Sequence, residues 1–124
     1  MQVKDVMRKP AVITDNISLG EAAGLMTSKG VDSIIFARND KLGGIITESD
    51  LIRNFGKRET VGDVMTRKVV VIESSKNLEA ALALMKEKKI KRLPVVEKGK
   101  LVGVITVTDL MAHAEELEEE FLFE

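Results

Sequence analysis

The same sequence pattern occurs twice in this chain. Residues 19–52 align without a gap on residues 78–111 at a shift of 59 positions, and twelve of the 34 pairs are identical. Upstream, residues 3–7 match residues 61–65 at a shift of 58, with four of the five residues identical. A tandem repeat of this length predicts two like units that cover one another's apolar faces, with a ligand site at the seam between them.

The composition narrows the class of protein. Of the 124 residues, 44% are hydrophobic and 31% are charged, which is ordinary for a soluble globular protein. No apolar run approaches the roughly 20 residues that a membrane span needs, and the first residues do not resemble a signal peptide. The chain has no cysteine, which excludes disulfides and thiolate metal sites. We therefore expect a cytoplasmic protein without membrane contact.

The charge is unevenly distributed along the chain. Six of the 20 acidic residues lie in the last ten positions, so the remainder carries 14 acidic against 19 basic residues. A moderately basic body can attract small anions. The basic cluster at residues 86–92 has no neighbouring aromatic residues or glycine-rich loop, which argues against nucleic acid as a partner.

Each repeat is predicted to read strand, helix, strand, strand, helix. In the first, a strand over 11–14 is followed by a helix that Ser18 and Glu21 open with a capping box and Gly30 closes. Strands over 31–37 and 42–46 form a hairpin, and a short helix covers 49–55. The second repeat follows the same plan, with a strand over 69–72, an Asn77 helix cap, a hairpin over 93–105 and a helix from about Thr108.

The last helix is expected to run longer than its counterpart. Leu110, Ala114, Leu117 and Phe121 follow at spacings of four, three and four, a seam suited to a partner helix. The acidic end could equally be frayed, since chain termini are often poorly ordered. We expect residues 1–56 to form the first repeat, 57–60 a linker, 61–113 the second repeat, and 114–124 an acidic helix or tail.

These elements indicate an α/β (α+β) architecture. Each repeat would hold a small sheet flanked by two helices, and a pseudo-two-fold axis would relate the repeats.

A Thr-x-x-Asp step joins the third strand to the second helix of each repeat, at Thr47–Asp50 and Thr106–Asp109. One interpretation is a capping box, which stabilises a helix start by about 1 kcal/mol and needs no ligand. The other is a ligand site, since a helix start suits a phosphate and two carboxylate oxygens match a ribose diol. Gly44 and Gly103, just upstream, would let a flat base or sugar approach the sheet.

The chain resembles a tandem pair of cystathionine-β-synthase (CBS) domains. The resemblance covers residues 1–113, and the chain is similar to the stand-alone CBS proteins of archaea and bacteria. Its motifs are Asp5-Val6-Met7, Asp63-Val64-Met65-Thr66, Arg92-Leu93-Pro94-Val95-Val96, Leu101-Val102-Gly103-Val104-Ile105-Thr106 and both Thr-x-x-Asp steps.

This resemblance implies a module that binds AMP, ADP, ATP or S-adenosylmethionine in two clefts between the repeats, commonly as a homodimer. One cleft would use Thr47, Asp50, Val71, Ile72, Lys91, Arg92 and Pro94. The other would use Ile13, Thr14, Asp32, Ser33, Thr106 and Asp109.

The two expected clefts differ in charge. Lys91 and Arg92 stand where the first repeat has Asp32 and Ser33, so the Asp50 cleft is predicted to hold phosphorylated adenosine more tightly. Phe36 and the missing proline of the first repeat weaken the case for the Asp109 cleft.

No catalytic constellation is evident. His113 is the single histidine and there is no cysteine, so the usual nucleophile–base pairs are nearly excluded. The sequence therefore predicts a regulatory module that is not an enzyme, needs no cofactor or metal, and acts on an unidentified protein by changing conformation. The alternative is a structural or interaction protein that keeps this fold without binding a ligand.

Overall fold

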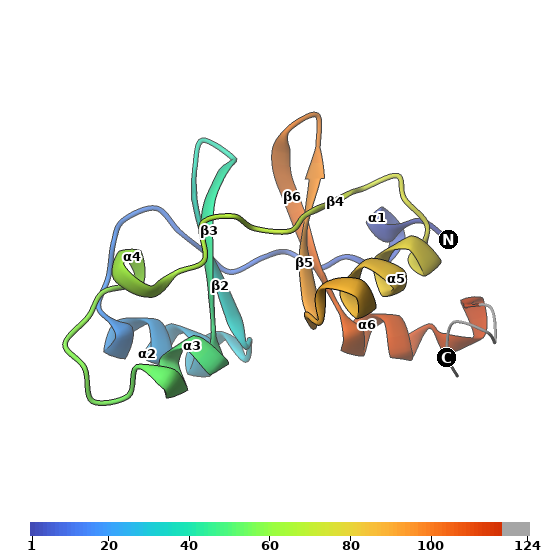
Figure 1. The fold of residues 1–124 in the computed structure, drawn as a ribbon. Coiled ribbons are helices and arrows are strands. Elements are labelled where there is room, and N and C mark those ends of the chain that lie inside the picture. Colours follow the sequence, from blue (N-terminus) through green and yellow to red (C-terminus); the bar gives the residue numbers. More distant parts are fainter. Residues whose placement is uncertain (118–124) are drawn as a thin grey trace. The chain divides into compact units, whose positions relative to one another are not determined.

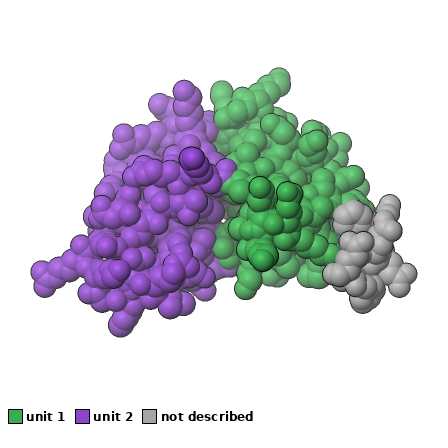
Figure 2. All heavy atoms as spheres, viewed as in Figure 1, with its two compact units in different colours: residues 1–9, 70–124 green, residues 10–69 purple. Residues whose placement is uncertain are grey.

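The computed structural model describes residues 1–117, which divide into two compact units. Of the described residues, unit 1 comprises 1–9 and 70–117, and unit 2 comprises Pro10–Val69 (Figures 1 and 2). The two units follow the same plan of a three-stranded sheet with helices packed against it.

Unit 2 holds a three-stranded sheet with helices packed against it. Its elements are β1 (Val12–Ile13), α2 (Leu19–Lys29), β2 (Ser33–Arg38), β3 (Lys41–Thr47), α3 (Glu48–Arg53) and α4 (Val61–Val64). The central strand β2 pairs in parallel with β1 and antiparallel with β3, so α2 is the crossover that a parallel pair requires.

The local sequence explains these elements. Ser18 accepts a hydrogen bond from the Glu21 backbone N–H at 3.1 Å, and Gly30 closes α2 in the left-handed conformation at φ 63°. Both predictions are confirmed. The β2–β3 turn places Asn39 and Asp40 at φ 51° and 63°, which suits these two residue types and the twist of a hairpin.

Unit 1 repeats the plan. Its elements are α1 (Val3–Val6), β4 (Ile72–Glu73), α5 (Leu78–Lys88), β5 (Arg92–Glu97), β6 (Lys100–Thr106), α6 (Val107–Ala112) and a 3₁₀ turn, η1 (Ala114–Glu116). Asn77 caps α5 as predicted, accepting from the Ala80 N–H at 2.8 Å. The helix ends on Lys89, a non-glycine residue at φ 55°.

Each unit has a core between its sheet and its helices. In unit 2 the apolar stripe of α2 (Leu19, Ala22, Met26) packs with Ile13, Ile34, Ile46 and Val61. In unit 1 the corresponding stripe of α5 (Leu78, Ala81, Leu82, Met85) packs with Val3, Ile72, Leu93, Val95, Ile105, Leu110 and Leu117. The predicted fold class, mixed α/β with small sheets and flanking helices, is therefore confirmed in each unit.

The opening segment of each sequence repeat packs on the sheet of the other repeat. Residues 1–9 belong to unit 1, where Arg8 and Val104 exchange backbone hydrogen bonds at 2.9 Å. Residues 61–69 belong to unit 2, where Ile45 and Thr66 make the matching pair at 3.0 and 2.9 Å. The chain therefore passes from one unit to the other at residues 9–10 and again at 69–70.

Two short helices were not predicted. Helices α1 and α4 lie within these opening segments. The sequence does carry their signal, since Gln2 and Thr60 each precede an Asp by three residues. The Gln2 N–H donates to Asp5 Oδ2 at 2.8 Å, and the Thr60 N–H donates to Asp63 Oδ2 at 2.9 Å.

The prediction of a long last helix is wrong over the described residues. Helix α6 ends at Ala112, η1 follows, and Leu117 returns to the core of its own unit with 7% of its surface exposed. A side chain buried in its own unit is unavailable as the seam for a partner helix. Phe121 and the rest of the acidic tail lie outside the described residues.

Candidate functional site

Strand β3 runs directly into helix α3 at Thr47, the N-cap residue. Asp50 Oδ2 accepts hydrogen bonds from the Thr47 backbone N–H at 2.8 Å and from the Thr47 hydroxyl at 3.2 Å. The Asp50 residue is 6% exposed. The capping interpretation of this step is therefore confirmed, and it uses one of the two carboxylate oxygens.

Thr106 and Asp109 build the same step between β6 and α6. Asp109 Oδ2 accepts from the Thr106 N–H at 3.0 Å and from its hydroxyl at 2.9 Å, and the Asp109 N–H donates back to the hydroxyl at 3.2 Å. Asp109 is 3% exposed. Each unit thus buries one carboxylate at the start of a two-turn helix.

The second oxygen of each carboxylate faces an arginine. Asp50 Oδ1 pairs with Arg53, one turn along the same helix, through its Nη2. Asp109 Oδ1 pairs with Nε of Arg8 at 2.6 Å. The two arginine side chains are 67% and 70% exposed, so each carboxylate is buried beneath a cation that itself reaches solvent.

These arginines come from different places in the two repeats. At a shift of 59 Arg53 corresponds to Ala112, and at a shift of 58 Arg8 corresponds to Thr66. Neither arginine is among the site residues predicted from the sequence. Arg53 was detectable from its i+3 spacing to Asp50, whereas Arg8 lies about a hundred residues from Asp109 and had no local signal.

The other predicted polar residues adjoin these steps within their own units. In unit 2, Ser33 is the register partner of Thr47, and the Asp32 carbonyl accepts from the Glu48 N–H at 3.0 Å. In unit 1, Arg92 is the partner of Thr106, and the Lys91 carbonyl accepts from the Val107 N–H at 2.9 Å. Within each unit, the structure thus brings together residues that the sequence had assigned to different clefts.

The remaining predicted residues lie on the strands. Ile13 pairs with Phe36, Ile72 pairs with Val95, and Pro94 is buried in β5 opposite Val104. The Thr14 carbonyl accepts from Nε of Arg38 at 2.9 Å, and Val71 directly precedes β4. Each predicted cleft draws on both units, so its assembly stays a prediction.

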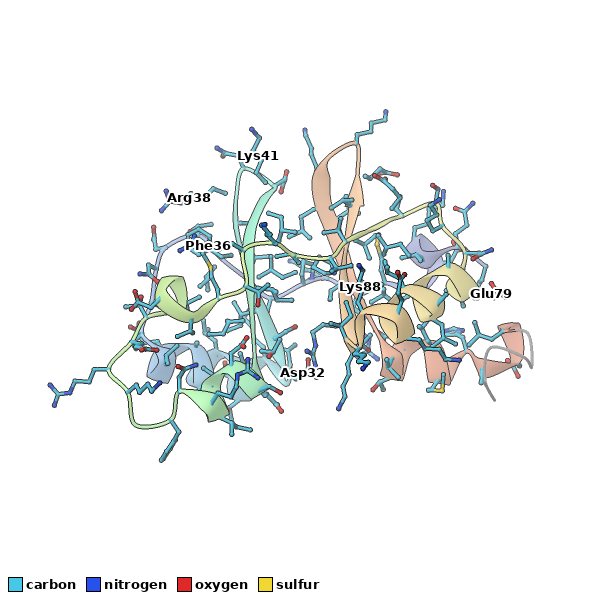
Figure 3. The ribbon with its side chains drawn as sticks, viewed as in Figure 1. Asp32, Phe36, Arg38, Lys41, Glu79 and Lys88 are labelled. Atoms are coloured by element: carbon cyan, nitrogen blue, oxygen red, sulfur yellow. The ribbon has the colours of Figure 1, made fainter. Side chains whose placement is uncertain are left out.

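Three labelled side chains of unit 2 lie at different points along its hairpin. Figure 3 shows Asp32 at the α3 end of the hairpin, Phe36 partway along β2, and Lys41 near the turn. The Arg38 guanidinium lies 5.6 Å from the centre of the Phe36 ring, a cation–π contact (Figure 3). The ring of Phe36 therefore contacts a side chain of its own strand. Phe36 lies three residues from Ser33, the register partner of Thr47.

The glycines of the third strands accommodate methionines from the opening segments. A Cβ on Gly44 would lie 2.5 Å from Met65 Sδ, and a Cβ on Gly103 would lie 2.5 Å from Met7 Sδ. At both glycines a methionine side chain makes the close approach to the backbone, and the approach of a base or sugar to the sheet stays a prediction. Met7 and Met65 fill the space that the missing side chains leave.

Among residues 1–117 neither a metal-ligand cluster nor a membrane-spanning helix is found. No group of three or more His, Cys, Asp or Glu side chains in that range is placed to hold a metal ion. No helix of the same range is long and apolar enough to cross a membrane.

The fold and its duplicated Thr–Asp step define the chain as a tandem pair of like α/β modules. The chain belongs to the CBS domain family, whose model matches residues 3–57 and 61–116. Among solved structures it is similar to the CBS domain pair of protein MJ0100 in complex with 5′-methylthioadenosine and S-adenosyl-L-methionine. The identity is 27%, the TM-score is 0.86, and 93% of this chain and 96% of that chain are covered.

Curated relatives include both short proteins and enzymes. The chain is 32% identical over 114 residues to the CBS domain-containing protein YhcV of Bacillus subtilis, covering 87% of this chain and 81% of that protein. It is 34% identical over 111 residues to inosine-5′-monophosphate dehydrogenase of Methanocaldococcus jannaschii, covering 88% of this chain. This chain spans only 22% of the length of that enzyme.

Proposed function

We propose that this chain is a regulatory module that binds an adenosyl compound, either a nucleotide (AMP, ADP or ATP) or a relative of S-adenosylmethionine. The observation that supports this most is the pair of buried carboxylates, one at the start of a helix in each unit. Each keeps one oxygen in the helix cap and turns the other toward an exposed cation. The second oxygen can accept from ribose hydroxyls when the arginine moves aside.

The ligand class comes from similarity to a CBS pair solved with two adenosyl compounds. Methylthioadenosine and S-adenosylmethionine share adenine and a ribose diol but differ in charge. A carboxylate that reads the diol would accept both. Other groups in the site would then determine whether phosphorylated or sulfonium ligands bind more tightly.

Calorimetry with adenosine, AMP, ATP, methylthioadenosine and S-adenosylmethionine tests the proposal. We expect at least one to bind below millimolar concentration. Asp50→Asn or Asp109→Asn should weaken ribose-containing ligands by about tenfold at its own site while leaving 2′,3′-dideoxyadenosine unaffected. If none of the five compounds binds, the sensor function is refuted, and the alternative of an interaction protein without a ligand takes its place.

A second experiment tests which carboxylate shares a ligand with the cations of the second repeat. The sequence assigned Lys91 and Arg92 to the Asp50 cleft and Asp32 and Ser33 to the Asp109 cleft. We therefore expect Lys91→Ala to reduce the preference for AMP over adenosine at the Asp50 site. A loss of that preference at the Asp109 site instead would reverse the assignment.

We also propose that ligand binding changes the conformation of this module and thereby its interaction with a regulated protein. We further propose that the chain forms a homodimer. The size of the first effect is limited by the difference in ligand affinity between the two conformations. For the dimer, the supporting observation is an exposed apolar pair on and after α3, Ile52 at 74% and Phe55 at 91% exposure. Ile52→Ser with Phe55→Ser should shift the mass measured by light scattering from dimer to monomer, with Met111→Ser as a matched change on α6.

A further inference from the structure

The two repeats shield their carboxylates with arginines from different elements. Arg53 stands one turn from Asp50 on the same short helix, so its charge is a local feature of α3. Arg8 comes from the opening segment and reaches Asp109 across the fold of unit 1. No cation is available at the local position, because the residue three beyond Asp109 is Ala112.

The Arg8 side chain is held at one end only. Its backbone is fixed by two hydrogen bonds with Val104 at 2.9 Å, and Met7 beside it packs against Gly103. The side chain itself is 70% exposed, and the structure records its Nε on Asp109 Oδ1 at 2.6 Å. An exposed arm on a fixed base can leave its partner without disturbing the segment that carries it.

The position of Arg8 conflicts with a diol on the same oxygen. Asp109 Oδ2 already accepts two hydrogen bonds from Thr106, so Oδ1 is the oxygen that remains for a ligand. A guanidinium at 2.6 Å occupies the approach to that oxygen, and Asp109 is 3% exposed beneath it. A ribose hydroxyl and Arg8 therefore cannot take Oδ1 by the same path.

We propose that Arg8 sets the affinity of the Asp109 site for adenosyl ligands by competing with the ribose for Oδ1. This inference rests on the proposed function, since it concerns how the same carboxylate is made available. Binding of the diol breaks the Arg8–Asp109 pair and returns the guanidinium to solvent. The cost of breaking that pair lowers the apparent affinity of the site.

The competition predicts a distinctive salt dependence. Added salt weakens an ion pair whose cation is exposed, although less than a fully exposed pair, and it has little effect on an uncharged ligand. Adenosine should therefore bind the Asp109 site more tightly in about 0.5 M NaCl than in about 0.05 M NaCl as long as Arg8 is present. Without Arg8 this gain should disappear.

The test uses the full chain carrying Asp50→Asn, so that only the Asp109 site retains its carboxylate. Adenosine binding is measured by calorimetry before and after adding Arg8→Ala. We expect the dissociation constant to fall by roughly three- to tenfold, in line with the loss of one partly exposed ion pair. 2′-Deoxyadenosine should gain less, because it lacks one hydroxyl of the diol.

Lys9→Ala is the matched control. It removes the same charge from the same segment, and Lys9 is exposed and takes no part in the pair with Asp109. It should leave the adenosine affinity unchanged within about twofold. Arg8→Lys is a second variant that keeps the charge, and it should restore part of the competition and of the salt effect.

The outcomes separate this inference from the proposed function. Tighter adenosine binding with Arg8→Ala but not with Lys9→Ala supports the competition. Equal or weaker binding with Arg8→Ala, in a chain that still binds adenosine, overturns the inference and leaves the proposed function standing. If these variants bind no adenosine while the chain with Asp50 intact does, the inference is overturned and the proposed function stands. If the unaltered chain binds no adenosyl compound either, the proposed function fails and the inference falls with it.

Discussion

Replacing Gly103 with alanine tests how the opening segment packs. At an unhindered position with negative φ, Gly→Ala stabilises a protein by about 0.4–1 kcal/mol through the unfolded chain. At Gly103 the new Cβ would lie 2.5 Å from Sδ and 2.9 Å from Cγ of Met7, and 3.2 Å from the Arg8 carbonyl oxygen. The thioether can turn away, but the carbonyl belongs to a paired backbone. Overpacking of this kind costs about 1–3 kcal/mol, so we expect net destabilisation of about 1–2 kcal/mol.

A double-mutant cycle isolates the contact. Met7→Ala alone removes a partly buried side chain and should destabilise by about 1–2 kcal/mol. In the double variant the alanine methyl occupies space that Met7 has left. We expect it to be no less stable than Met7→Ala, which corresponds to a coupling energy of about 1–2 kcal/mol.

Because each opening segment packs on the sheet of the other repeat, the structure also predicts which methionine contacts each glycine. Gly103 and Met65 belong to the same sequence repeat, yet it is Met7 that packs against this glycine. Gly103→Ala should therefore couple to Met7→Ala and be additive with Met65→Ala within about 0.5 kcal/mol. Gly44→Ala should show the reverse preference.

Urea unfolding followed by circular dichroism is the suitable assay, because the chain has no tryptophan or tyrosine to report by fluorescence. The reasoning is refuted if Gly103→Ala is neutral or stabilising in the presence of Met7. Coupling to Met65 in place of Met7 would refute the exchange itself.

Three further predictions concern single residues. Lys89→Gly should stabilise the chain by about 0.5–1 kcal/mol in thermal unfolding, because Lys89 ends α5 in the left-handed conformation that Gly30 occupies in the other repeat; Gly30→Lys should do the opposite. Hydrogen bonds from the Thr60 backbone and hydroxyl lower the pKa of Asp63, so its stabilising effect is present above the ordinary aspartate pKa and is lost as pH falls through the lowered one. A carboxyl-carbon NMR titration should show the lowered midpoint moving up in Thr60→Val, and no movement would contradict the hydrogen-bond cause. Leu117→Ala should destabilise by about 2–3 kcal/mol in the same unfolding assay, whereas a change below about 0.5 kcal/mol would show that Leu117 is not part of the core.

Local signals in the sequence predicted the elements well. The Ser18–Glu21 box, the glycine after α2 and the Asn77 cap each act within a few residues, so the chain itself fixes where these helices begin and end. The hairpins were found for the same reason. Helix α6 was predicted to run too far, because the spacing from Leu110 to Leu117 fits both a continuous helix and a chain that turns back to the core.

Long-range pairing explains what was missed at the site. Of the two interpretations of the Thr47–Asp50 and Thr106–Asp109 steps, the capping box is confirmed, because its hydrogen bonds are local. Arg8 reaches Asp109 only because residues 1–9 pack on unit 1, and the matching stretches 3–7 and 61–65 give no sign of which sheet each would join. A repeat that predicts the fold therefore conceals this pairing, since either opening segment suits either sheet.

Each sequence repeat contributes its opening segment, residues 1–9 or 61–69, to the unit that holds the sheet of the other repeat. Cleavage of the 57–60 stretch, for instance by trypsin after Lys57 or Arg58, would break one covalent link, yet each fragment would still carry a segment embedded in the other fragment's fold. The nicked halves would stay together until one of them unfolds. A single repeat expressed alone could exchange its opening segment with a second copy of itself. The duplicated chain therefore resembles a domain-swapped dimer whose two copies are joined end to end.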